Sequence, residues 1–209
     1  VEPLEPDEAR KLAAALLPGD EPALAEAVAR ESGGNPYFVA ELVRHVRDGA
    51  TDLAAIPGRL ALDDVLWSRI GRRPEDARRV LEIVAASGKP LRLADLGRCL
   101  HDPVDERPAL ALLRAARLVR GAGRAGTDEV ESYHDRVRET VAARLAPDVA
   151  RRAHLRLATV LEESGEADPE DLGRHYEAAG DPAKAAPHYA AAADEAADAL
   201  AFERAARLY

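Results

Sequence analysis

Residues 130–145 have the sequence VESYHDRVRETVAARL, and the spacing of their apolar side chains changes halfway along. Val130 and Ser132 fall on one face of a short alternating segment, as in a strand with one buried side. Beyond residue 135 the apolar positions repeat every fourth residue, which places them in one stripe of a helix: Val137, Val141 and Leu145. The stretch therefore predicts a strand that leads directly into a helix.

His134 and Asp135 occupy the junction between this strand and this helix. Asp135 stands where the first helical turn needs an acceptor, so we expect it to cap the helix. The His134 ring N–H and the unpaired backbone N–H groups of the first turn can then point at the same anion. The junction is thus a candidate phosphate-binding site. The alternative is purely structural: His134 hydrogen-bonds a neighbouring carbonyl group and Asp135 only caps.

The chain has 209 residues, of which 47% are hydrophobic, enough for one large or two to three small domains. Its one cysteine, Cys99, cannot form an internal disulfide, and no apolar run nears the roughly 20 residues that cross a bilayer. We therefore expect a cytoplasmic location without a membrane contact. Because the sequence lacks an initiator Met and a signal-peptide pattern, we interpret it as a piece of a longer protein.

The formal net charge is −9, and only residues 61–125 form a basic block. The arginines of this block are scattered in pairs, such as Arg72-Arg73 and Arg78-Arg79, and do not mark one helix face. This distribution argues against DNA as a partner.

Apolar spacing predicts helices along most of the remaining chain. A linker over residues 51–58, marked by Ile56-Pro57-Gly58, separates the first three helices from the next four. We expect a short hairpin, and after it a long helix from Pro147 with His154 as a structural hydrogen-bonding residue on its flank. The expected helices before the hairpin lie at residues 7–17, about 24–28, 36–46, 62–70, 74–87, 93–100 and 106–117.

Residues 32–36, Ser-Gly-Gly-Asn-Pro, open the third helix. We expect Asn35 to cap it and Pro36 to occupy its first position. Gly34 allows a close backbone approach, and the Pro36 ring offers a flat apolar face to a planar ligand. An ordinary turn between two helices is the alternative.

Residues 133–135, Tyr-His-Asp, resemble the Met-His-Asp signature that closes the winged-helix domain of the signal-transduction ATPases with numerous domains, the STAND class. Only the first position differs, with Tyr133 in the place of Met. In that class the histidine contacts the β-phosphate of bound ADP and holds the closed state. The resemblance implies this role for His134, with Asp135 orienting it or capping the helix.

Gly34-Asn35-Pro36 resembles the Gly-x-Pro motif in the helical lid of STAND and wider AAA-type ATPases, and residues 31–42 resemble the family's form of that lid helix. The resemblance implies that Pro36 packs on the adenine base, next to Gly34 and Asn35. Residues 151–154 also resemble the Arg-x-x-His found at this place in bacterial members. The motifs stand in the order in which the family has them.

The sequence from Leu172 matches the tetratricopeptide spacing, with Gly173 next, an aromatic residue three positions later, Ala185 nine after that, and Tyr189 four further on. Gly173 and Ala185 are small because two helices should cross closely there, with residues 180–182 as the turn. We expect an alanine stripe to start a further helix: Ala193, Ala197, Ala201 and Ala205. One repeat cannot bury its own face, so at least two more should follow in the parent protein.

Several chemical signatures are missing. Residues 121–126 match GxGxxG literally, but they lead into a strand and open no helix, so we interpret them as the hairpin turn. No GxxxxGK[S/T] loop and no strand ending in paired acids is present, so nothing in the sequence can cradle and cleave a triphosphate alone. No histidine spacing suggests zinc. We expect neither a catalytic nor a metal site.

We therefore interpret the chain as mainly α. A helical lid spans residues 1–50, a winged-helix domain with a small β-hairpin spans 58–146, and a helical linker with the start of a tetratricopeptide-like α-solenoid spans 147–209.

The resemblance implies that this stretch, itself no enzyme, is the regulatory part of a bacterial STAND switch of the transcriptional-regulator or kinase-associated type. An upstream P-loop domain in the same chain would bind ATP or ADP with Mg²⁺. A protein partner or effector would bind the repeats, and activation could assemble an oligomer. Two other hypotheses stay open: a protein-interaction scaffold without a nucleotide role, and a DNA-binding winged helix.

Overall fold

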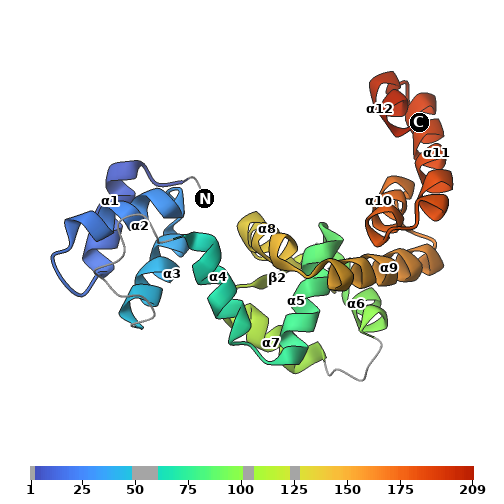
Figure 1. Cartoon of the computed structure of the whole chain (residues 1–209). Coiled ribbons are helices and arrows are strands. Elements are labelled where there is room, and N and C mark those ends of the chain that lie inside the picture. The colour runs from blue at the N-terminus through green and yellow to red at the C-terminus, as the bar shows by residue number, and fades with distance from the viewer. Residues whose placement is uncertain (1–2, 49–60, 101–105, 123–127) are drawn as a thin grey trace. The chain divides into compact units, whose positions relative to one another are not determined.

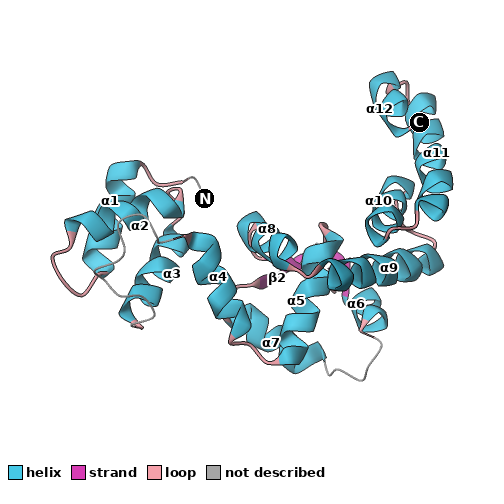
Figure 2. Cartoon of the chain, in the orientation of Figure 1, coloured by secondary structure: helices cyan, strands magenta, loops and turns pink. Residues whose placement is uncertain are grey.

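The computed structural model is mainly α over the residues that it describes, which are 3–48, 61–100, 106–122 and 128–209 (Figure 1). Twelve helices hold 74% of these residues, and three short strands form an antiparallel sheet, as Figure 2 shows. The prediction of a mainly α chain with a small β element is confirmed. Contacts group the residues into two units, 1–72 and 73–209, and each is described by itself. The predicted domain boundaries stay predictions.

The first unit contains four helices: α1 (Pro6–Leu16), α2 (Pro22–Ser32), α3 (Pro36–Arg47) and α4 (Leu62–Gly71). Proline is the first residue of α1, α2 and α3, where its missing N–H leaves no intrahelical bond unmade. Helix α1 packs on α2 and α3, and α4 packs on α3. Val28, Val39 and Leu42 are fully buried between them. The predicted linker at residues 51–58 lies outside the described residues.

The second unit begins with four helices and three strands. Their bounds are α5 (Glu75–Ser87), β1 (Leu91–Arg92), α6 (Leu93–Cys99), α7 (Glu106–Ala115), β2 (Val119–Ala122), β3 (Glu129–Ser132) and α8 (Asp135–Arg144). Helix α5 is central, because it contacts α7, α8 and β3. Its buried stripe, including Val80, Leu81 and Val84, packs into the core of this part. We call this part, residues 75–144, the sheet module.

The sheet has the order β1-β3-β2, with both neighbouring pairs antiparallel. Val119 pairs with Ser132 across the predicted hairpin, and the hairpin is confirmed. The third strand was not predicted, because β1 has only two residues and no period can be read from so short a segment. Leu91 pairs with Val130, and both are buried. The glycine-rich run at 121–126 falls mostly outside the described residues.

The second unit ends with four helices, α9 (Pro147–Ser164), α10 (Pro169–Ala179), α11 (Pro182–Asp198) and α12 (Phe202–Leu208), each packed on the next. A Cβ atom added to Gly173 would lie 2.7 Å from the Tyr189 ring, so the predicted close crossing of two helices is confirmed. Gly180 ends α10 in the left-handed region, and Asp181 caps α11 through Lys184 N.

The predicted start of a new helix at Ala193 is wrong. Ala193 and Ala197 belong to α11, which continues to Asp198, and α12 begins only at Phe202. Leu200 takes a positive φ of 60° between them and ends the helical run. Alanine favours helix at every position, so an alanine stripe cannot locate such a break.

Among the described helices, none combines the length and the apolar character that a membrane crossing requires.

Candidate functional site

The turn before α3 has the predicted local form. Gly33 and Gly34 take positive φ values of 57° and 77°, which glycine adopts without steric cost. The Asn35 side chain caps α3 by accepting a hydrogen bond from Tyr37 N at 3.0 Å. Pro36 is the first helical residue and is half-buried. The cap and the glycines therefore hold the Pro36 ring in a defined position at the helix start.

The close backbone approach at Gly34 is made by the chain itself. Leu4 N donates a hydrogen bond to Gly34 O at 2.8 Å. A Cβ atom added to Gly34 would lie 2.4 Å from Leu4 O, which is too close for any side chain. Glycine at position 34 is thus required by the extended segment before α1, and this requirement alone does not indicate a ligand.

A buried polar network follows one turn into α3. The Glu41 carboxylate is 4% exposed and forms an ion pair with Arg69 of α4. Arg69 also donates to the Tyr37 hydroxyl oxygen at 2.8 Å, and Arg44 lies 3.3 Å from the second carboxylate oxygen of Glu41. A buried carboxylate needs such partners, because removing one would leave an uncompensated charge. The network therefore joins α3 to α4, and sequence spacing did not reveal it.

His134 lies on the surface at the N-terminus of α8. Its Nδ1 atom accepts a hydrogen bond from Arg136 N at 3.1 Å, so His134 is the helix cap. The prediction that Asp135 caps the helix is wrong, because Asp135 is already its first helical residue. The His134 imidazole nitrogen accepts from the backbone N–H of the second helical residue, as the carboxylate of a capping Asp would. The cap is therefore His134, one residue before the predicted Asp135. A neutral ring with an accepting Nδ1 carries its proton on Nε2, which is then a donor.

Asp135 points to another set of partners. Its carboxylate lies 3.5 Å from Arg138, one turn along α8. It also lines a cavity of about 40 Å³ together with Lys89 and Ser132. That volume is far below the roughly 300 Å³ at which small-molecule sites begin. Asp135 is therefore placed to balance nearby cations at the helix start.

The five predicted site residues divide between the two units. Gly34, Asn35 and Pro36 belong to the first, and His134 and Asp135 belong to the second. Each set is brought together locally. The joint contact of Pro36 and His134 with one nucleotide stays a prediction.

A histidine pair lies between α9 and α10. His154 Nδ1 and His175 Nδ1 are 2.9 Å apart, and Arg174 Nη2 lies 3.3 Å from His175 Nε2. Because a guanidinium can only donate, His175 Nε2 accepts and its Nδ1–H donates to His154 Nδ1. His154 is thus structural, as predicted. His175 was missed, although a histidine inside an apolar repeat was a visible signal.

Burial determines the protonation of this pair. His175 is 1% exposed, and desolvation first, then Arg174, lowers its pKa to about 3. Desolvation, and to a smaller extent Arg174, also lowers the pKa of His154. Both rings are therefore neutral at neutral pH, as the hydrogen bond between them requires.

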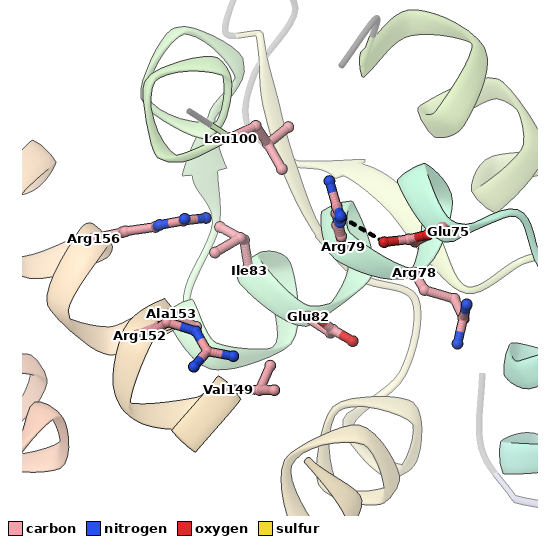
Figure 3. A pocket seen from close by; sticks show the side chains of 10 residues that line it. All are labelled: Glu75, Arg78, Arg79, Glu82, Ile83, Leu100, Val149, Arg152, Ala153 and Arg156. Atoms are coloured by element: carbon pink, nitrogen blue, oxygen red, sulfur yellow. Dashed lines mark hydrogen bonds and ion pairs between the residues drawn. The ribbon is translucent and has the colours of Figure 1, made fainter. Parts of the chain in front are cut away.

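An arginine-rich groove lies between α5 and α9, both in the second unit (Figure 3). It measures about 410 Å³ and is lined by Arg78, Arg79, Arg152 and Arg156 together with two glutamates. The sequence offered a signal for it, since Glu75, Arg79 and Glu82 recur at helical spacing. Only the packing of α5 on α9 shows that these residues share one opening.

The part of the chain that the structure describes contains no group of three His, Cys, Asp or Glu side chains placed to hold a metal ion. Burial raises the pKa of Cys99 to about 12, so its thiol is protonated and unreactive in the folded protein.

No protein-family model, no curated protein and no solved structure matches this chain.

Proposed function

We propose that this chain is the regulatory portion of a STAND-class nucleotide switch that holds an ADP-bound, autoinhibited state against an upstream P-loop domain. The observation that carries the proposal is the His134 ring, exposed at the N-terminus of α8. Its Nδ1 is engaged by Arg136 N, so Nε2 carries the proton and can donate to a phosphate oxygen. The positive end of the α8 dipole favours the same anion.

The Pro36 turn supplies the second part of the proposal. Its ring is held by the Asn35 cap and lies half-buried at the start of α3. A fixed, flat apolar ring can pack on one face of an adenine base without losing rotamer freedom. In the proposal Pro36 contacts the base and His134 contacts the β-phosphate.

The described residues fit only part of a nucleotide site. A surface histidine donor suits one phosphate oxygen, whereas a triphosphate with Mg²⁺ needs a phosphate-cradling loop and acidic ligands. The upstream domain of the same chain would supply these groups, and any ATP hydrolysis would occur there. In the proposal the described residues bind the nucleotide, orient it and sense its phosphates.

The finer architecture also belongs to the proposal. The order of α5, β1, α6, α7 and the β2–β3 hairpin agrees with a winged helix. The successive packing of α9 to α12 agrees with the start of a tetratricopeptide solenoid that binds a protein partner or effector.

Polar contacts within the second unit connect the helices α9 and α10 to the sheet module, and a conformational change could pass through them. Lys89 lies 2.6 Å from Asp171 of α10, and Arg174 donates to Ser87 O at 3.0 Å. Arg92 of β1 forms an ion pair with Glu166, between α9 and α10. The two parts are therefore linked by opposite charges, so a partner that displaces α10 would pull on the sheet module. This would favour the open state, ADP exchange for ATP, and assembly.

The test uses the full-length protein that contains this chain, loaded with fluorescent ADP. His134→Ala should release ADP roughly tenfold faster and raise basal signalling, because one charge-assisted hydrogen bond is lost. Glu139→Ala changes an exposed residue of the same helix and serves as the control. An unchanged ADP release rate in the His134 variant would refute the phosphate contact.

A protein-interaction scaffold is the second candidate, and one observation favours it. Leu200, Phe202 and Tyr209 are 73%, 66% and 75% exposed, respectively. Apolar side chains gathered near α12 are typical of a surface that packs on another protein segment. Under this hypothesis His134→Ala would leave nucleotide affinity unchanged.

A further inference from the structure

The arginine-rich groove between α5 and α9 has the form of a small-ligand site. Its volume of about 410 Å³ lies in the range of roughly 300–1,000 Å³ that such sites occupy. Ile83, Ala153 and Leu100 line it as apolar residues and are each at most 5% exposed. In Figure 3, Arg152 and Arg156 extend from α9 toward α5. A polar rim with an apolar floor is therefore present.

The arginines of this groove differ in how they are paired. Within it, Arg79 pairs with Glu75 at 2.5 Å and Arg152 with Asp148 at 2.7 Å.

Arg78 and Arg156, by contrast, form no ion pair with a carboxylate among residues 3–48, 61–100, 106–122 and 128–209. Arg156 donates to Cys99 O at 3.5 Å. Two guanidinium groups are thus left with donors to offer. Each can bind a tetrahedral or planar oxyanion through two parallel N–H groups.

The lining favours an oxyanion that more than one arginine can bind. Four arginines face two lining glutamates, and Asp148 pairs with Arg152, which leaves an excess of one positive charge at the groove on a chain whose net charge is −9. A phosphate monoester has three acceptor oxygens and a charge of about −1.5 to −2 at neutral pH, so it can accept from two guanidinium groups at once, whereas a carboxylate offers only two oxygens. The buried floor would cover an apolar body attached to the phosphate.

We propose that the groove binds a small organic phosphate, with the phosphate group held by Arg156 and by the N–H groups of Arg152 that its single contact with Asp148 leaves available, and with the organic part on Ile83 and Leu100. This site is separate from the proposed nucleotide contact, because it shares no residue with Gly34, Asn35, Pro36, His134 or Asp135. Ligand bound here would lie across α5 and α9, and so would bridge the sheet module and the repeats.

A substitution at Glu82 should strengthen phosphate binding, which a misfolded variant would not do. Burial raises the pKa of Glu82, although Arg78, Arg79 and Arg152 oppose the shift. Its carboxylate repels an incoming phosphate. Glu82→Gln removes this charge at nearly the same shape and should tighten binding several-fold.

The experiment titrates the 209-residue chain with phenyl phosphate by calorimetry, with inorganic phosphate as the probe without an apolar body. Phenyl phosphate should bind more tightly than inorganic phosphate. Arg156→Ala and Arg152→Ala should each weaken binding about tenfold, the effect of one lost charged hydrogen bond. Arg151→Ala is the matched control, since Arg151 is exposed on the same helix and does not line the groove.

Three outcomes would overturn the proposal. Phenyl phosphate could fail to bind at millimolar concentration, Arg151→Ala could weaken binding as much as Arg156→Ala, or Glu82→Gln could weaken it. Measurable binding of polyglutamate without measurable binding of phenyl phosphate would assign the groove to an acidic peptide instead. An unchanged ADP release rate in His134→Ala would leave this result untouched, so the two proposals fail separately.

Discussion

Three histidines of the second unit, His134, His154 and His175, lie in two contrasting environments. His134 is exposed at the start of α8, where its Nδ1 atom caps the helix. His154 and His175 face each other between α9 and α10. Because Arg174 donates to His175 Nε2, the proton of His175 is on Nδ1 and points at His154. The His134 ring faces solvent, whereas the His154–His175 pair is packed between two helices. The same side chain is therefore suited to a ligand in one place and to holding two helices together in the other.

The difference comes from desolvation. At the pair, burial opposes the charged form of both rings, and the pKa of His175 falls to about 3. Two neutral imidazoles can then share one proton as donor and acceptor. Protonating either ring would place a second N–H against an existing donor. The interface between α9 and α10 therefore depends on the neutral state.

The largest effect is expected for His175→Ala. The substitution leaves a cavity and removes the hydrogen-bond partner of both His154 and Arg174, which together should cost about 3 kcal/mol of unfolding free energy. Chemical denaturation of the 209-residue chain, followed by circular dichroism, measures this loss. A cost below that of an ordinary surface substitution would mean that the pair contributes nothing to the packing of α9 on α10.

Acid should reproduce part of that loss in the unchanged protein. The folded pKa of His175 is about 3 and the unfolded value is near 6.5, so the unfolded state binds more protons between these values. Stability is complete above about pH 6.5 and declines as the pH falls toward 3. By pH 5 the loss attributable to His175 is about 2 kcal/mol. Denaturation curves at pH 7, 6 and 5 test this.

Two variants sharpen the pH result. His175→Ala should lose most of the slope between pH 6.5 and 5, because the titrating group is gone. Arg174→Gln removes the second cause of the low His175 pKa, so the slope should persist in a reduced form. The same slope in all three proteins would assign the acid sensitivity to other groups.

The contrast between local and distant contacts also separates the features that the sequence predicted from those that it did not. Long apolar repeats predicted α3 and α9, and residue types at single positions predicted the Asn35 cap and the close crossing at Gly173. The helices and the cap depend on neighbours along the chain, whereas the crossing of Gly173 with Tyr189 of α11 was predicted from the spacing of a known repeat. The local spacing at the strand-to-helix junction was correct as well, except that the imidazole of His134 took the capping role given to Asp135.

Other contacts between residues distant in the sequence were not predicted. His154 and His175 are 21 residues apart, Glu41 and Arg69 are 28 apart, and the groove joins α5 to α9, which are separated in the sequence by the rest of the sheet module. Nothing in the spacing of one helix specifies which face of another it will meet. The protonation of the pair and the shared arginine lining of the groove appear only after packing.

The smallest expected effect on stability is that of His134→Ala, which removes a helix cap and should cost about 1 kcal/mol or less. His134→Asp provides the sharper comparison. An Asp at this position can cap α8 and favours its dipole, so stability should return to that of the unchanged protein in denaturation experiments. A carboxylate cannot donate to a phosphate, however, so the same variant in the full-length protein should release ADP as fast as His134→Ala does. Restored ADP retention in His134→Asp would show that the ring acts only as a cap, and the distinction between the exposed and the buried histidines would then rest on burial alone.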